Sequence, residues 1–232
     1  IRMGQKHMRA ASRIVANCFV LLTGMAVLIM AVTFLLKDRL LVWFGASPAI
    51  FPYADAYLTW YLLGTVFALL ATGMNQFIIC QGFAKTGMLS VVLGAVCNIA
   101  LDPVFIFVLD MGVKGAAIAT VLSQMVSCAC VLGFLFSKRP TVRITFGSYR
   151  RRVMEQVLAV GLSPFLIIAT DSILIIVMNM AIQRYGGSQG DMLLTCNTIV
   201  QSFMLIITMP LGGITGGTQT IMGYNYGAGR PD

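Results

Sequence analysis

Hydrophobic residues dominate six long stretches of the chain, and short segments that carry most of the charges separate them. The stretches cover residues 14–36, 56–84, 86–109, 115–137, 156–183 and 192–229. Four of them contain no charged residue, and the other two contain one aspartate each, Asp102 and Asp171. A membrane-spanning helix needs about 20 mainly apolar residues. Each stretch is long enough, so the pattern predicts six transmembrane helices.

Composition supports an all-α membrane protein. Hydrophobic residues make up 58% of the 232 residues and charged residues only 10%, with a mean hydropathy of +0.88. A soluble domain carries roughly 25% charged residues, so this chain has too few to cover a water-facing surface. Outer-membrane strands would be runs of about 10 alternating residues, and the long uninterrupted stretches favour helices instead.

The charged segments alternate between basic and balanced. The first segment holds four basic residues and no acidic one, the connection at Lys85 holds one basic residue, and residues 138–155 hold six basic residues and one glutamate. The segments between these are balanced. Because positive loops stay cytoplasmic, we expect both termini, Lys85 and the loop 138–156 on the cytoplasmic side of the plasma (inner) membrane. The net charge of +8 thus indicates topology and contact with anionic lipid headgroups rather than nucleic-acid binding.

Residues 138–156 form the one sizeable linker that we expect. It contains Pro140, Gly147 and the run 150–152 of arginines, which we interpret as a topology anchor. The predicted organisation is a cytoplasmic segment (1–13), four helices (14–137), the basic linker (138–156) and two further helices (157–232). The chain starts without an initiator methionine and stops directly after an apolar run, so we expect both ends to be internal points of a longer protein.

Asp102 is the most informative polar residue in the predicted spans. Asn98 lies four residues earlier, so the two side chains stack on one helix face. Pro103 has no N–H to donate to the carbonyl of Ile99. Carboxylate, carboxamide and a free carbonyl would form an oxygen cage for Na⁺ or a proton site, and charged residues in spans are functional by default. The alternative is an interhelical polar contact.

Small residues at four-residue spacing mark the stretch 115–137. Ala116 and Thr120 form one row, and Ala119, Ser123 and Ser127 form another. Such rows allow close helix approach, which would let the Thr120 hydroxyl reach a neighbouring carboxylate. Packing is the alternative role for Thr120.

The last two spans carry a second polar group. Four residues at spacings of four, three and four share one face: Asn197, Gln201, Met204 and Thr208. This face predicts a cavity wall, to which Asp171 of the preceding span is a further candidate. Pro210, followed by two glycine pairs, predicts a bending point.

Several of these residues carry a family resemblance. Residues 98–103 (Asn-Ile-Ala-Leu-Asp-Pro) and 112–120 closely resemble the fifth and sixth helices of the MATE (multidrug and toxic compound extrusion) transporters. Residues 161–164 resemble the start of the seventh helix of that family, and residues 223–229 the end of the eighth. The resemblance implies a twelve-helix fold of two lobes in an inverted V with an internal six-helix repeat, of which this chain would supply helices three to eight. The repeat aligns residues 3–6 with residues 226–229.

The resemblance implies a function as well as a fold. MATE proteins are antiporters that export cationic, amphipathic or aromatic compounds in exchange for H⁺ or Na⁺ by alternating access. The implied class is a transporter and not an enzyme, without a cofactor beyond the coupling ion. Its expected partners are drugs or dyes, the lipid bilayer and the helices outside this chain. The cation site of the family's N-terminal lobe maps onto four residues here: Tyr57, Asn98, Asp102 and Thr120. Pro103 and Pro210 would be the hinges.

Three other functions are consistent with parts of the pattern. A flippase for lipid-linked saccharides is expected to line its cavity with cationic groups, and the predicted spans contain none. An intramembrane aspartyl protease could pair two membrane aspartates, but Leu101-Asp102-Pro103 and Thr170-Asp171-Ser172 lack the sequence context of those enzymes. A channel would show flux without exchange.

Overall fold

The structure is a computed structural model that describes residues 1–44, 51–145, 147 and 149–230. These residues form six helices that are long and apolar enough to cross a membrane, which confirms the all-α prediction. The helices are α1 (Met8–Trp43), α2 (Phe51–Cys80), α3 (Ala84–Pro103), α4 (Gly112–Phe136), α5 (Arg151–Tyr185) and α6 (Gly190–Gly227). A π-helical turn, η1 (Val104–Val108), follows α3, and a short 3₁₀ turn, η2 (Gly187–Gln189), precedes α6.

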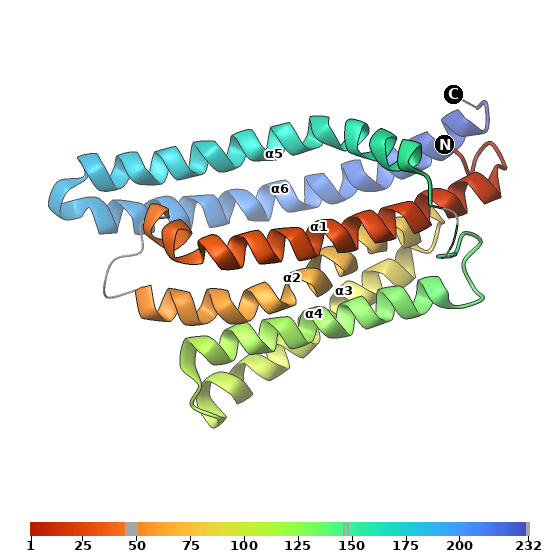
Figure 1. Cartoon of the computed structure of the whole chain (residues 1–232). Coiled ribbons are helices and arrows are strands. Elements are labelled where there is room, and N and C mark those ends of the chain that lie inside the picture. Colours follow the sequence, from red (N-terminus) through yellow and green to blue (C-terminus); the bar gives the residue numbers. More distant parts are fainter. Residues whose placement is uncertain (45–50, 146, 148, 231–232) are drawn as a thin grey trace.

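Helices α1 to α4 form one bundle, in which α2 packs against both α1 and α4, and α3 packs against α4 (Figure 1). Its core consists mainly of buried apolar side chains of α1, α2 and α4: Val15, Leu70, Met74, Ile78, Cys128, Val131 and Leu135. Small residues bring the backbones close, as they do in membrane bundles generally. A Cβ atom on Gly64 of α2 would lie 2.5 Å from a methyl carbon of Val121 on α4.

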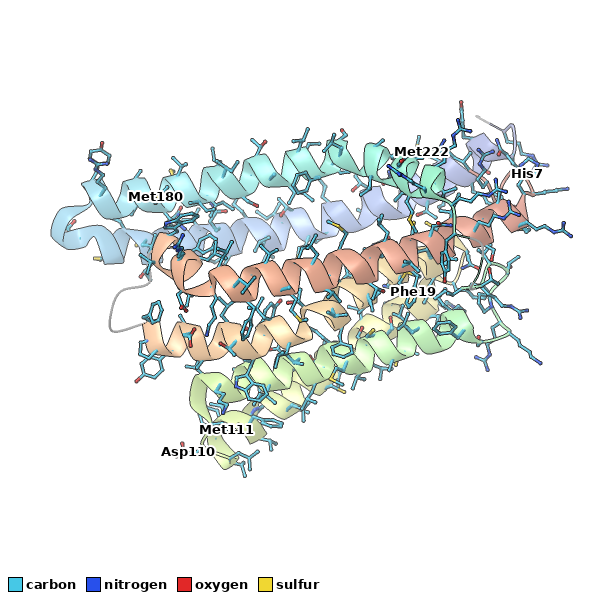
Figure 2. The ribbon with its side chains drawn as sticks, in the orientation of Figure 1. His7, Phe19, Asp110, Met111, Met180 and Met222 are labelled. Atoms are coloured by element: carbon cyan, nitrogen blue, oxygen red, sulfur yellow. The ribbon has the colours of Figure 1, made fainter. Side chains whose placement is uncertain are left out.

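The connections gather at two opposite ends of the molecule. The start of the chain, the ends of α2 and α6 and residues 138–145 lie at one end, which we call the basic end because basic residues gather in these segments (Figure 1). Figure 2 shows His7 at this end and Asp110, in the turn before α4, at the other. The segments that the charge pattern assigns to one side of the membrane therefore share one end of the fold.

Helices α5 and α6 pack against each other and run beside the bundle (Figure 1). The described hydrogen bonds that join them to the bundle lie at the basic end. The backbone N–H of Arg150 donates to Oδ1 of Asn17 at 3.0 Å, and Sγ of Cys80 lies 3.8 Å from Oγ1 of Thr220.

At the basic end, the first residues of the chain cross the end of α6, and each segment has a glycine at the crossing. A Cβ atom on Gly4 would lie closer to the backbone of Tyr224 and Ala228 than the shortest contacts that Cβ atoms make in proteins. A Cβ atom on Gly227 would lie equally close to the backbone of Ile1. The repeat alignment pairs Gly4 with Gly227 and, three residues earlier, Ile1 with Tyr224. The crossing is therefore reciprocal, as a contact between two related halves would be.

Two boundaries differ from the expected organisation. Helix α1 begins at Met8, within the segment expected to precede it, and α5 begins at Arg151, so residues 151–156 are helical and not part of the linker. The guanidinium of Arg151 pairs with Glu155 one turn on, at 2.9 Å. Such a pair supports a helix, although both residues looked like loop residues by charge.

Candidate functional site

The predicted pair of Asn98 and Asp102 stands on the last turn of α3. Both residues are half-buried, and Nδ2 of Asn98 donates to Oδ1 of Asp102 at 3.3 Å. Helical geometry alone brings them together, because residues four apart lie one above the other. The carboxamide oxygen of Asn98 and the second carboxylate oxygen thus share one helix face, where they can bind a cation.

Pro103 changes the winding of the backbone directly after this pair. It ends α3, the N–H of Val104 donates to the carbonyl of Leu101, and Val104–Val108 continue as a π-helical turn. A proline removes the hydrogen bond to the residue four before it, and π-helical turns are frequent at functional sites. The carboxylate of Asp102 therefore lies where the helix is least regular.

A cavity of about 490 Å³ lies between α2, α3 and α4, next to this pair. Asn98 and Thr120 line it together with neutral polar side chains of α2 and α4: Thr72, Asn75, Gln76, Ser123, Gln124 and Ser127. The side-chain oxygens of Asn75 and Gln124 are buried without a hydrogen-bond partner. The lining residues include no charged group, and their amide and hydroxyl oxygens can accept hydrogen bonds from water or bind a cation.

Sequence analysis missed Asn75 and Gln124 as members of this site. The signal for Asn75 was a polar face on a predicted span, because Thr72, Asn75 and Gln76 recur at the spacing of one helix face. The signal for Gln124 was a second such face with Thr120 and Ser127. A polar face within a span points to the bundle interior or to a water-filled cavity.

Thr120 lines the same cavity as Asn98 but does not reach a carboxylate as expected. Its hydroxyl donates to the carbonyl of Ala116, on its own helix, at 2.9 Å. Threonine in a helix commonly makes this bond. The oxygen lone pairs of Thr120 stay available to a bound cation.

Tyr57 lies on α2, 11 residues before the first cavity residue of that helix, Ala68. Its ring stacks on that of Tyr61, with ring centres 5.8 Å apart. Eleven residues correspond to about 16 Å along a helix, so the described contacts of Tyr57 do not join it to Asn98 or Asp102. Its place in the cation site stays a prediction.

The cavity wall that the polar residues of the last two spans predict stays a prediction as well. Nδ2 of Asn197 on α6 donates to Oδ1 of Asn179 on α5 at 3.3 Å. Asp171, Gln201 and Met204 are exposed side chains of α5 and α6, and no described contact joins them to Asp102. Pro210 lies inside α6, which continues as one helix from Gly190 to Gly227.

Comparisons with known proteins agree with this architecture. The MatE family model matches residues 2–104. The probable multidrug resistance protein YpnP of Bacillus subtilis is 28% identical over 92% of this chain and 47% of its own length. A multidrug resistance MATE family transporter of the MOP superfamily, solved in an outward-facing conformation, superimposes with a TM-score of 0.89 at 29% identity, over 99% of this chain and 51% of its own. A MATE solved in complex with Br-NRF superimposes with a TM-score of 0.79 at 27% identity, over 99% of this chain and 53% of its own.

Six helices of membrane length, with Asn98 beside an uncharged polar cavity, define a multi-pass membrane protein. The family match over residues 2–104, the relatives and the solved structures all point to one family: the chain is similar to the MATE transporters. This confirms the resemblance found in the sequence and the expectation of a transporter rather than an enzyme. The chain spans about half the length of the relatives that it matches.

Proposed function

We propose that this chain supplies the cation site and part of the substrate path of a multidrug exporter. One observation carries the proposal: the hydrogen-bonded pair of Asn98 and Asp102 stands beside a cavity lined by uncharged oxygens, in a family whose relatives are named for multidrug resistance and export. The expected cargo is cationic or aromatic and amphipathic, exchanged for H⁺ or Na⁺.

The donor set fits a hard cation. Asp102 would supply the negative charge, and Asn98 and Thr120 would supply neutral oxygens, which are the ligands that hard cations prefer. A charge inside the membrane is costly unless it is neutralised. Either Na⁺ or a proton on Asp102 would remove that cost, so both ions are candidates for coupling.

Alternating access would follow from cation binding. A bound ion shifts a conformational equilibrium only by the difference between its affinities for the two states. Pro103 is the proposed hinge in α3, because the helix already changes its winding there, and Pro210 is the proposed hinge in α6. Four residues are proposed to face the substrate: Asp171, Asn197, Gln201 and Met204.

The proposed setting is the plasma (inner) membrane with the basic end in the cytoplasm. The basic residues of that end would contact anionic lipid headgroups, and the other helices of the transporter would complete both the cation site and the substrate path. In this orientation the α3–α4 turn, with Asp110, faces the outside.

The natural-length protein in proteoliposomes tests the proposal. Efflux of a cationic fluorescent dye is followed under an imposed H⁺ or Na⁺ gradient. Asp102→Asn should reduce gradient-driven efflux at least tenfold, since it removes the charge and keeps the shape. The matched control is Asp110→Asn, an exposed residue with φ of 49°, a backbone conformation that asparagine accepts. Equal efflux by Asp102→Asn and wild type would refute the role of Asp102. A wild type that moves no dye under either gradient would refute dye export and favour the saccharide flippase.

A further inference from the structure

Residues 138–145, which we call the strap, pack against the bundle. Their side chains alternate: Pro140, Val142 and Ile144 are buried. The residues between them are exposed: Arg139, Thr141, Arg143 and Thr145. This alternation of buried and exposed side chains gives the strap one apolar face. Val142 and Ile144 belong to the bundle core.

Polar side chains of the bundle fix the backbone of the strap. The hydroxyl of Ser12 on α1 donates to the carbonyl of Arg143 at 2.9 Å. Oε1 of Gln81, just after α2, accepts from the N–H of Val142 at 2.8 Å. Buried apolar side chains and backbone hydrogen bonds together leave the strap little freedom to move independently of α1 and α2.

Asn17 makes a further attachment, at the start of α5. Its side chain is 1% exposed. Nδ2 donates to the carbonyl of Arg13 at 2.7 Å, and Oδ1 accepts from the N–H of Arg150 at 3.0 Å. Arg150 is the N-cap residue of α5, with extended backbone angles of −133° and 117°. A buried amide whose donor and acceptor are both engaged has a fixed orientation, so Asn17 fixes the point at which α5 begins.

We infer that the strap moves as part of the α1–α4 bundle, that Asn17 is the positioning residue for α5, and that the pivot between bundle and α5 lies at Arg150–Arg151. This inference rests on the proposed alternating access. Hinges are commonly a few residues at the end of an element that absorb a change of backbone angles. Here Asn17 holds the N–H of Arg150, and α5 begins at the next residue.

Spin-label distances in the natural-length protein test the inference, in a background without the native cysteines. One label pair joins Met25 on α1 to Thr141 on the strap, and the other joins Met25 to Val160 on α5; all three side chains are exposed. Distances are measured with and without Na⁺ and at two pH values. We expect the first distance to stay constant and the second to shift. A strap distance that changes as much as the α5 distance, or dye efflux with neither distance changing, would overturn the inference.

Variants of Asn17 give a second readout that does not need transport. Asn17→Ala should broaden the distribution of the Met25–Val160 distance and leave that of Met25–Thr141 unchanged. Ser12→Ala is the matched control, since it removes an attachment in the middle of the strap. In an active protein, Asn17→Ala should lower kcat for dye efflux severalfold with KM unchanged.

These outcomes separate the inference from the proposed function. A protein without gradient-driven efflux but with the expected response to Asn17→Ala would refute the export proposal and keep the positioning role. Equal broadening of both distances in Asn17→Ala, or no broadening of either, would refute the positioning role even in an active exporter.

Discussion

The reciprocal crossing of Gly4 and Gly227 gives a sharp prediction about how the basic end closes. A methyl group on Gly4 would lie well within 3.0 Å of the carbonyl oxygen of Tyr224 and the backbone nitrogen of Ala228. On Gly227 it would meet the backbone of Ile1 at a similarly short distance. Backbone atoms cannot rotate out of the way as a side chain can. Gly4→Ala or Gly227→Ala should therefore force the two segments apart.

The expected size follows from the cost of overpacking. Added methyl groups in a tight contact typically cost about 1–3 kcal/mol. If that cost falls only on the arrangement with the basic end closed, it reduces the population ratio of the closed to the open arrangement by about 5- to 150-fold. Because both glycines lie in one crossing, the double variant should cost less than the sum of the two single variants.

The rate of disulfide formation across the basic end measures the population of the closed arrangement. Cys80 and Thr220 face each other at 3.8 Å, so Thr220→Cys in a background that keeps only Cys80 should oxidise readily to a crosslink. Gly4→Ala should slow crosslinking at least fivefold. Gly223→Ala is the control, because nothing lies within 4 Å of a Cβ atom there. Crosslinking that Gly4→Ala leaves unchanged, or that Gly223→Ala slows equally, would refute the argument.

Three further predictions concern stability, measured as thermal unfolding in detergent. In a double-mutant cycle, Lys37→Met and Asp55→Asn should show a coupling of about 1 kcal/mol, because their ion pair at 2.6 Å is only partly exposed; independent effects would contradict this. Gly115→Ala should destabilise by about 1–3 kcal/mol, since its Cβ atom would lie 2.6 Å from a carbonyl oxygen of η1. Gly133→Ala, which meets nothing within 4 Å, should have little effect, and similar losses in both would contradict the packing argument. Met74→Ala should cost about 2–5 kcal/mol, because Met74 is fully buried in the core, and a loss under 1 kcal/mol would show that the core collapses around the gap.

The local part of the site could be predicted from the sequence. Apolar runs of membrane length fix the number of spans, since an unpaired backbone is too costly in lipid. Asn98 and Asp102 meet because residues four apart share a helix face, whatever surrounds them. The alternation of basic and balanced segments likewise assigned the connections to two groups, which the fold places at opposite ends. Each of these features depends on neighbours within a few residues or on a simple sum of charges.

Contacts between distant segments were decided only by the tertiary structure. The cavity combines Asn75, Asn98 and Gln124 from three helices, and no periodicity along one helix indicates which faces meet. The Thr120 hydroxyl bonds to a carbonyl of its own helix, 2.9 Å away. Residues 138–156 looked like a charged linker, yet Asn17 holds the N–H of Arg150 across 133 residues of sequence. Residues so far apart are brought together by the packing of whole helices, which depends on shape complementarity among all of them at once.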